Sequence, residues 1–363
     1  MQKKIVFIIN SIQNPRCIKR LNEFIDKGYD VTAYAFSRGD LIFNNIQSKI
    51  ILLDTYSNDL SYIKRLPILY NNIKSIVANN KDVVYYLFGL EVAMIFKIIA
   101  YTHKYIYEES DLVHTYLSNK FLRYILEKFD KYLISKSIMT VFTSEGFIKY
   151  HFGDTKPDNC IVVPNRLSPE VKQYKIKQKQ PCEKLKIGFV GKIRYNSVKS
   201  FVEIFCKEYP NNEFHFFGNI GSQKEIEMFS PLNQYSNCIF HGPFKNPDDL
   251  PSIYSQINLV LSTYDVTYEN VRYAEPNKLY ESIYFETPII VSKGTFLADK
   301  VDKLGIGFSI DPFDRDNIIS LVDKLSLDDV KINLRCIDKD YTINNNSHLF
   351  IKLDKLFNIS SNQ

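Results

Sequence analysis

The sequence predicts an α/β protein made of two tandem Rossmann-like domains, each built on an open parallel sheet. Short apolar runs alternate with amphipathic stretches from one end of the chain to the other. The runs are almost continuously hydrophobic rather than alternating, which is typical of strands buried on both faces. A length of 363 residues suits two domains, at ~100–200 residues each. Helices between such strands form right-handed βαβ units.

The apolar runs predict seven strands in the first half of the chain and six in the second. The first set is KIVFII, DVTAYAF, KIILL, DVVYYLF, KYIYE, MTVFT and CIVVP, and the second is LKIGFV, EFHFFG, CIFHG, NLVLST, PIIVS and GIGFSI. The first helix has clear end signals, because Asn14 is a good N-cap, Pro15 suits the first helical position and Gly28 suits the end. The segment SHLFIKLDKLF predicts a terminal helix.

A polar stretch rich in lysine and glutamine, KQYKIKQKQPCEK at 172–184, marks the boundary between the domains. Such a composition is typical of a linker. We therefore expect a first domain at 1–168, a linker at 169–184, a second domain at 185–340, and a C-terminal helix and tail at 341–363. The cleft between two such domains is the expected ligand site.

The bulk composition excludes several classes of protein. The fractions of hydrophobic (45%) and charged (24%) residues are ordinary for a soluble globular protein. The sequence has no apolar run near the length of a membrane span, and the short run IVFII near the N-terminus predicts a buried strand rather than a signal peptide. The six cysteines form no C-x-x-C pair, which argues against zinc and disulfides and favours a reducing cytoplasm.

The net charge of +5 lies entirely in the first half of the chain, where residues 1–165 carry 21 basic and 16 acidic residues (21 − 16 = +5). This half could meet an anionic partner such as a phospholipid surface, or it could simply carry a solvated face with a mild lysine excess. The segment 119–136 is basic and amphipathic, with Phe121, Ile125 and Phe129 as its apolar stripe. We expect the stripe to pack on its own sheet, and a membrane surface is the alternative.

Known nucleotide-binding motifs are absent from the starts of both domains. IINSIQNPRC contains no glycine, and GFVGKIRYNS lacks the third glycine of G-x-G-x-x-G, so a dinucleotide oxidoreductase is not predicted. The sequence has no G-x-x-x-x-G-K-[ST], which leaves a P-loop nucleotidase unsupported. It also has no D-x-D metal motif, and we expect no metal and no cofactor.

The stretch EPNKLYESIYFETP at 275–288 predicts a helix with an unusual first turn. Lys278 lies in that turn, where the helix dipole disfavours a cation unless an anion is bound. Glu281 follows three residues later on the same face, and a carboxylate can accept two hydrogen bonds from neighbouring sugar hydroxyls. A diphosphate with a ribose would account for both residues. The alternative is a surface ion pair between Lys278 and Glu281.

A second cationic turn opens the second domain in the segment GKIRYNSVKS. Gly191 allows a ligand to approach the backbone closely, and Lys192 and Arg194 add charge at the carboxyl end of a strand, where open α/β sheets bind ligands. We expect Lys199 to begin a solvated helix face instead.

Three carboxylates gather at one strand end of the first domain, in YEESDLVH. Crowding of Glu108, Glu109 and Asp111 should raise at least one pKa, which suits a general base. The alternative is helix capping by Ser110 or Asp111. His114 nearby is more often a structural residue.

Taken together, these segments resemble the retaining glycosyltransferases of family 4 and the related capsule and O-antigen enzymes of GT-B architecture. YEESDL resembles a family strand end, FVGKIRY the phosphate turn, and EPNKLYESIYFETPIIVS the donor motif P-N-x-x-x-E-A-x-A-x-G-x-P-V-V. The resemblance implies a GT-B fold with an interdomain cleft. It implies donor-binding residues Gly191, Lys192, Arg194, Glu275, Asn277, Lys278 and Glu281, acceptor-binding residues Asn14 and Arg16, and catalytic residues Asp111 and Glu108.

The sequence departs from this family at two positions. The E-x7-E pattern would need a glutamate eight residues before Glu281, and that position is Tyr273. Glu286 replaces the usual glycine before the threonine–proline pair. If the enzyme inverts the anomeric centre, Asp111 or Glu108 is the expected base; if it retains the configuration, no protein nucleophile is evident.

The resulting hypothesis is a cytoplasmic glycosyltransferase. It would move a sugar from a nucleotide diphosphate donor, a UDP-sugar first, to a hydroxyl of a lipid-linked bacterial surface glycan of capsule or O-antigen type. Its partners would be the donor, the glycan acceptor and the inner face of the cell membrane, and not nucleic acid. The alternatives are a nucleotide-sugar epimerase of the same architecture and a non-catalytic subunit of a polysaccharide assembly complex.

Overall fold

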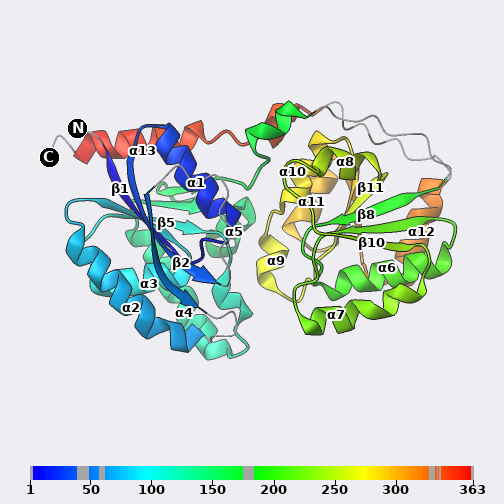
Figure 1. Ribbon diagram of the computed structural model, residues 1–363, viewed down its shortest axis with the longest axis horizontal. Coiled ribbons are helices and arrows are strands. Elements are labelled where there is room, and N and C mark those ends of the chain that lie inside the picture. Colours follow the sequence, from blue (N-terminus) through cyan, green and yellow to red (C-terminus); the bar gives the residue numbers. More distant parts are fainter. Residues whose placement is uncertain are drawn as a thin grey trace. The chain divides into compact units, whose positions relative to one another are not determined.

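A computed structural model describes residues 3–38, 49–56, 62–174, 184–326, 332, 334 and 337–360 of the chain. The chain forms two compact units (Figure 1). The first comprises Met1–Pro164 together with Asn345–Gln363, and the second comprises Asn165–Asn344. Residues 345–363 thus belong to the first unit. Of the predicted linker 169–184, residues 175–183 lie outside the described residues.

The first unit is built on a seven-stranded parallel sheet within the described residues, with the order β3-β2-β1-β4-β5-β6-β7. The strands are β1 (Lys4–Ile9), β2 (Asp30–Arg38), β3 (Lys49–Tyr56), β4 (Val84–Phe88), β5 (Tyr105–Glu109), β6 (Met139–Phe142) and β7 (Cys160–Val162). The helices are α1 (Pro15–Asp26), α2 (Tyr62–Asn79), α3 (Leu90–Ile99), η1 (Val113–Tyr116), α4 (Lys120–Lys136), α5 (Glu145–Phe152) and α13 (Ser347–Ser360).

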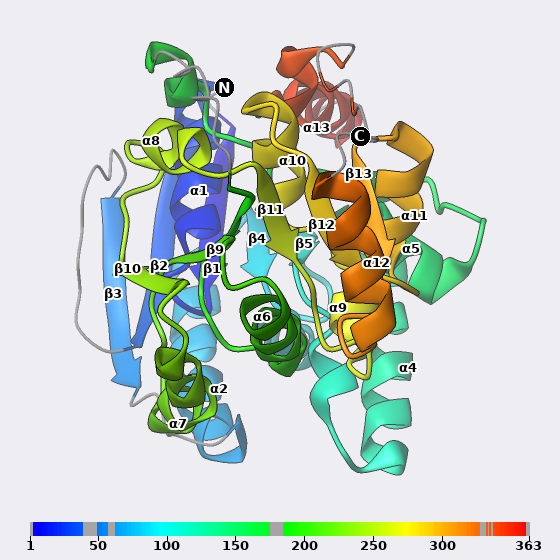
Figure 2. The same cartoon turned by 90° about the vertical axis from the view of Figure 1, so that its right-hand side faces the viewer.

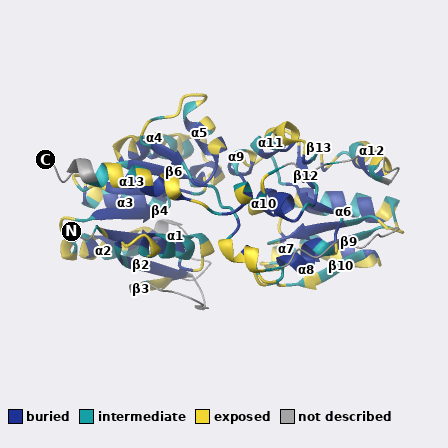
Figure 3. Cartoon of the chain, turned by 90° about the horizontal axis from the view of Figure 1, so that it is seen from above, coloured by how far each residue is buried: buried dark blue, intermediate teal, exposed yellow. Residues whose placement is uncertain are grey.

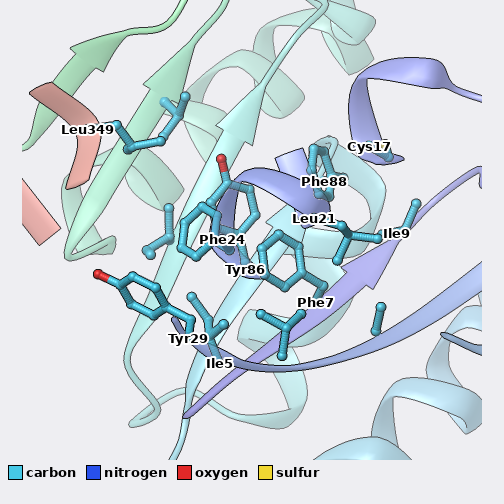
Figure 4. Close-up of a cluster of buried hydrophobic side chains, with 14 of the residues drawn as sticks. Ile5, Phe7, Ile9, Cys17, Leu21, Phe24, Tyr29, Tyr86, Phe88 and Leu349 are labelled. Carbon is cyan, nitrogen blue, oxygen red and sulfur yellow. The ribbon is translucent and has the colours of Figure 1, made fainter. Parts of the chain in front are cut away.

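An aromatic cluster joins this sheet to α1 and to the C-terminal helix α13 (Figure 4). Phe7 of β1 stacks on Tyr86 of β4 with ring centroids 4.6 Å apart. It meets Phe24 of α1 edge-on at 5.2 Å. Phe24 in turn meets Phe350 of α13 at 5.0 Å. These contacts explain why the C-terminal residues belong to the first unit.

The second unit has a six-stranded parallel sheet within the described residues, with the order β10-β9-β8-β11-β12-β13. The strands are β8 (Lys186–Val190), β9 (Glu213–Phe217), β10 (Cys238–Gly242), β11 (Leu259–Ser262), β12 (Ile289–Ser292) and β13 (Gly307–Ile310). The helices are η2 (Pro169–Gln173), α6 (Asn196–Glu208), α7 (Gln223–Phe229), η3 (Ser230–Gln234), α8 (Leu250–Ser255), α9 (Glu269–Tyr273), α10 (Asn277–Tyr284), α11 (Phe296–Leu304), α12 (Arg315–Ser326) and η5 (Lys339–Thr342).

Apolar cores cover both faces of this second sheet. One core contains side chains of α8, α10 and α11, and the other contains side chains of α6 and α12. Figure 2 shows α10 beside β11, and Figure 3 shows strands β4, β6 and β9 largely in the colour of buried residues. Val171 of η2 is buried in the first of these cores, so this part of the predicted linker packs into the second unit.

Every strand predicted from an apolar run is present, and the strands of the described residues are all parallel. The predicted ends of the first helix are confirmed, because the Asn14 side chain accepts a hydrogen bond from the Arg16 backbone N–H and Gly28 follows the helix with φ +80°. Strand order reverses between β1 and β4 and between β8 and β11. In open α/β sheets these switch points are where ligands bind.

The end of α10 explains one departure of the sequence from its family pattern. Glu286 adopts φ +51°, in the left-handed region that favours glycine. Its carboxylate lies 2.6 Å from the Lys339 ammonium. The chain therefore keeps the backbone conformation for which glycine is usual, and an ion pair holds the glutamate there.

The expectation that the Phe121 stripe of α4 packs on its own sheet is wrong. Phe121 is 71% exposed and Ile125 is 44% exposed. The buried residues of α4 are Asp130, Leu133 and Ile134. Asp130 accepts a hydrogen bond from the buried Tyr107 hydroxyl on this inward face. Among the described residues, no helix combines the length and the apolar character that crossing a membrane requires.

Replacing Phe7 with alanine should destabilise the first unit by about 3–5 kcal/mol, because it opens a cavity among packed rings. Urea denaturation of the full chain measures the loss. The matched control is Ile98→Ala, at a side chain that is 61% exposed, which should change the stability by less than about 0.5 kcal/mol. An equal loss in both variants would contradict the assignment of this core.

Candidate functional site

The turn after β8 brings the backbone of the second unit into an unusually close packing. Gly191 has φ +131°, and its N–H donates to the Phe217 carbonyl at 2.8 Å. A Cβ at Gly218 would lie only 1.9 Å from the Gly191 carbonyl oxygen. Glycine is therefore required at Gly218, and this contact holds the Gly191 turn at the switch point between β8 and β11.

Lys278 projects from the first turn of α10 to this same turn. A Cβ at Gly191 would lie 3.5 Å from the Lys278 Nζ. The Nζ lies 4.3 Å from the ring centroid of Phe189 and 5.8 Å from that of Tyr264. The ammonium therefore sits on aromatic faces at the carboxyl edge of the sheet, in a favourable cation–π geometry.

The Lys278 ammonium has no counter-ion within the described residues, where no carboxylate lies within 4.0 Å of it. The side chain is buried, and burial is the main reason that its pKa is lowered to about 8. Glu281 acts against this shift, and the nearby Arg194 adds to it. The alternative of a surface ion pair between Lys278 and Glu281 is wrong, because both residues are buried and they form no such pair.

Glu281 lies one turn further along α10, and it is also buried. Its Oε2 accepts a hydrogen bond from the Tyr254 hydroxyl at 2.7 Å. Burial raises the pKa of Glu281, while Tyr254 and Lys278 act in the opposite direction. Its Oε1 has no hydrogen-bond partner among the described residues, so one carboxylate oxygen remains to accept a ligand hydroxyl.

The other predicted donor-binding residues near this turn, Arg194, Lys192 and Asn277, are exposed. Arg194 donates to the Tyr195 hydroxyl at 2.6 Å, and its guanidinium lies 4.8 Å from the same ring. Lys192 packs against Gly221, where a Cβ would lie 2.6 Å from the lysine Cε. Asn277 is exposed at the start of α10. All three lie on the segments that carry Gly191 and Lys278.

Two neighbouring residues have structural partners. Lys199 pairs with Glu203 one turn along α6 at 2.8 Å, so its expected place on a solvated helix face is confirmed. The Asp265 carboxylate accepts hydrogen bonds from the Asn196 and Ser197 N–H groups. The N-terminus of α6 is therefore already capped by a carboxylate of the protein.

Glu275, a predicted donor-binding residue, is bound within the second unit. Its Oε2 lies 2.8 Å from the Lys300 ammonium, and its Oε1 accepts from the Tyr280 hydroxyl. Both oxygens are used, and the side chain is buried. In this structure Glu275 anchors α10 to α11.

Glu108 of the first unit is a buried member of a charged network. Its Oε2 accepts from the Arg20 Nε at 3.0 Å and from the Tyr86 hydroxyl. Arg20 also pairs with Glu23 at 2.7 Å. Glu108 is fully buried, and its Oε1 has no hydrogen-bond partner, whereas Asp111 is exposed in the turn after β5.

Glu109 lies in a separate buried cluster. Its carboxylate oxygens lie 2.9 and 3.1 Å from the His151 Nε2, and its pKa is raised to about 7 by burial first and by Asp130 second. Among the described residues, Glu109, Asp130 and His151 are the set whose ligand atoms lie close enough together to hold a metal ion. His114 lies 3.3 Å from Asp130 in the same cluster.

The predicted acceptor-binding residues lie together at the start of α1. Asn14 is partly buried and uses its side-chain oxygen to cap the helix. The Arg16 guanidinium has two nitrogens, Nε and one terminal nitrogen, that are buried without a hydrogen-bond partner. A cation with unused donors suits an anionic group.

The second unit can now be compared with known protein families. Residues 170–342 match the model of a family described as glycosyl transferases group 1. This part of the chain belongs to that family. The match contains Gly191, Lys278 and Glu281, and together with the fold it makes the chain a glycosyltransferase of GT-B type. No curated protein matches the chain.

Solved structures share the fold over almost the whole of this glycosyltransferase. Sucrose-phosphate synthase (tll1590) from Thermosynechococcus elongatus is 14% identical with a TM-score of 0.69, covering 90% of each chain. Anabaena Alr3699/HepE, in complex with UDP and glucose, is 13% identical with a TM-score of 0.68, covering 98% of this chain and 99% of the other. WaaG, a glycosyltransferase involved in lipopolysaccharide biosynthesis, is 15% identical with a TM-score of 0.58, covering 89% and 90%.

Several residues of the glycosyltransferase site could not be identified from the sequence. Phe189 lies under the Lys278 ammonium, Tyr254 holds Glu281, and Lys300 holds Glu275. Phe189 lies two residues before Gly191, so its place next to the predicted turn could have suggested it as a site residue. Tyr254 and Lys300 lie in other helices, and no spacing in the sequence connects them to α10.

Replacing Lys278 with methionine should stabilise the free protein and abolish its response to diphosphates. A lysine pKa depressed in the folded state costs stability in full below that pKa, and the cost fades as the pH rises from the folded pKa toward the higher pKa of the unfolded state. With a folded pKa of about 8, the cost at pH 7 is at most about 3 kcal/mol. Thermal unfolding measures both effects.

The matched control is Lys199→Met, which removes a lysine that already has a surface partner. Its melting temperature should change little, and its response to diphosphates should persist. A Lys278→Met variant that melts lower than the parent and still responds to diphosphates would refute the assignment.

Proposed function

We propose that this glycosyltransferase transfers a sugar from a nucleotide diphosphate donor to a hydroxyl of a lipid-linked bacterial surface glycan. The observation that carries the proposal is the Lys278 ammonium, which is buried beside Gly191 and has no counter-ion among the described residues. A diphosphate would supply the missing negative charge, and it would also receive the N–H groups at the start of α10. Stabilising the leaving diphosphate lowers the barrier to transfer.

The nucleotide would lie with its ribose against Glu281. One oxygen of that carboxylate is held by Tyr254, and the other would accept a ribose hydroxyl. Lys192 and Arg194 would add charge on the solvent side of the diphosphate, beside the backbone of Gly191. We propose a UDP-sugar as donor because a solved structure of similar fold carries UDP and glucose, and we propose that no metal takes part.

The first unit would bind the acceptor. Arg16 has unused donors for an anionic acceptor, such as one carried on a lipid phosphate, and Asn14 lies beside it. Asp111 is the better candidate for a general base because it is exposed, whereas Glu108 is buried between Arg20 and Tyr86. A base of this kind suits an inverting reaction, which agrees with tyrosine at position 273.

We further propose that the enzyme works in the cytoplasm, at the inner face of the cell membrane, in capsule or lipopolysaccharide synthesis. A solved structure of similar fold is a glycosyltransferase of lipopolysaccharide biosynthesis. The positive charge of the first half of the chain agrees with an anionic surface.

A nucleotide-sugar epimerase is the rival activity, because one of the structures of similar fold is described as a UDP-N-acetylglucosamine 2-epimerase. The family match at 170–342 favours the transferase. Incubation of the donor without an acceptor separates the two activities, since an epimerase converts the donor sugar and a transferase does not.

UDP or another nucleoside diphosphate should raise the melting temperature of the full chain. A ligand at 100 times its dissociation constant stabilises the folded state by ~2.7 kcal/mol, which amounts to several degrees for a domain of this size. A thermal-unfolding panel of nucleoside diphosphates and nucleotide-sugars measures the shift and narrows the donor class. The absence of any shift across both sets would contradict the donor site.

Replacing Glu281 with alanine should weaken UDP binding by about 1.5–3 kcal/mol, the range for hydrogen bonds to charged groups. Calorimetric titration measures the change in the dissociation constant. The control is Glu203→Ala on α6, which removes a carboxylate that pairs with Lys199 at the surface and should leave the affinity unchanged. A Glu281→Ala variant that binds UDP as tightly as the parent would contradict the proposed contact between Glu281 and the ribose.

A further inference from the structure

The first unit exposes a cluster of large apolar side chains where η1 leads into α4. Its members come from the end of η1, the following loop and the first two turns of α4: Tyr116 (50% exposed), Leu117 (36%), Phe121 (71%), Leu122 (50%), Tyr124 (57%) and Ile125 (44%). We call this set the α4 patch. Single exposed apolar residues are normal, but contiguous groups of them mark a surface that binds something.

The buried side of α4 explains why the α4 patch faces outward. Asp130, Leu133 and Ile134 are the buried residues of the helix, and Asp130 accepts from the Tyr107 hydroxyl at 3.0 Å. Phe121 and Ile125, one turn apart, share a face that those three residues do not. The buried face of α4 thus combines the Asp130 carboxylate with Leu133 and Ile134, and Phe121 and Ile125 lie on the exposed side of the helix.

The net positive charge of α4 favours an anionic partner for the α4 patch. The helix carries Lys120, Arg123, Lys128, Lys131 and Lys136 against Glu127 and Asp130, so its net charge is 5 − 2 = +3. Asp130 is buried, and Glu127 pairs with Lys131 at 3.0 Å. The acidic charges are therefore neutralised or hidden, while Lys120, Lys128 and Lys136 remain exposed.

The lysines also lie beside the aromatic rings of the helix. The Lys128 ammonium lies 5.3 Å from the ring centroid of Tyr124, and the Lys136 ammonium lies 5.9 Å from that of Tyr132. Tyrosine and lysine both have an apolar body and a polar end, and both suit the boundary between lipid and water. Exposed apolar side chains flanked by lysines are the pattern of a helix that lies in a membrane interface.

We propose that the α4 patch docks the first unit onto an anionic lipid bilayer, with Phe121 and Ile125 entering the interface and the lysines contacting lipid phosphates. The biological role of this docking rests on the proposed function, because docking would bring the enzyme to a lipid-linked acceptor. Binding to the bilayer itself requires neither donor nor acceptor.

Co-sedimentation of the full chain with vesicles tests this surface without any substrate. The vesicles are phosphatidylcholine alone, or phosphatidylcholine mixed with phosphatidylglycerol. The parent protein should sediment with the anionic vesicles, less with the neutral ones, and less in high salt. The double variant Phe121→Ser, Ile125→Ser should bind anionic vesicles at least ~10-fold more weakly, because two large apolar groups no longer enter the interface.

Two further double variants complete the design. Lys120→Gln with Lys128→Gln should lose most of the preference for anionic vesicles, at roughly fivefold per lysine. Ile226→Ser with Phe313→Ser is the control, since it removes side chains of the second unit that are 46% and 48% exposed, and its binding should match the parent. Because the lysines are exposed, the glutamine variant tests the proposal even if the serine variant folds poorly.

Three outcomes would overturn the proposal. The parent could fail to sediment with anionic vesicles, or the serine variant could bind as the parent does. Light scattering could instead show a dimer that the serine variant dissociates, which would make the α4 patch an interface between copies of this chain. Because the donor response is measured separately by thermal unfolding, failure of vesicle binding would leave the transferase proposal standing.

Discussion

The Lys278 ammonium is the constraint around which the second unit is arranged. Burying a cation without a counter-ion is destabilising, and side chains in that situation usually acquire a carboxylate partner or lose their proton. Here the ammonium is placed on the Phe189 ring at 4.3 Å, and burial lowers its pKa to about 8. The Gly191 turn comes close to it without a side chain in between. Such a site is stabilised when an anion arrives.

In the first unit, by contrast, the buried charged side chains have partners. Glu108 is met by Arg20 and by the Tyr86 hydroxyl, and Glu109 is met by His151. Both carboxylates have partners inside the unit and contribute to its structure, although the Glu108 Oε1 is buried without a hydrogen-bond partner. The two glutamates near α10 differ in the same respect. Lys300 and Tyr280 occupy both carboxylate oxygens of Glu275, whereas Glu281 keeps one oxygen available for a ligand.

Much of the fold could be predicted from local patterns, because buried parallel strands appear as continuous apolar runs and helix ends have their own signals. The terminal helix 347–357 was predicted, but its return to the first unit depends on Phe350 meeting Phe24, which no local pattern contains. The orientation of α4 was missed for a similar reason, since its buried face includes Asp130, which accepts a hydrogen bond from the distant Tyr107. Long-range contacts decide both cases.

For the site, the sequence identified the residues whose types are unusual for their place, such as a lysine in the first turn of α10. It could not show which carboxylates are already bound. Lys300, Tyr280 and Tyr254 determine that, and they come from α11, α10 and α8. The structure is therefore needed to tell Glu281 from Glu275, and Asp111 from Glu108, as candidates for contact with a ligand.

The most direct test of this account is the number of protons taken up when UDP binds at pH 8, measured by calorimetry in two buffers of different ionisation enthalpy. At that pH about half of the Lys278 side chains lack their proton in the free protein. A bound diphosphate should restore the proton by raising the pKa. We predict an uptake of about half a proton, no uptake in Lys278→Arg, whose side chain is always charged, and an affinity that falls as the pH rises beyond 8. Binding of UDP without proton uptake in the parent would contradict the placement of the diphosphate at Lys278.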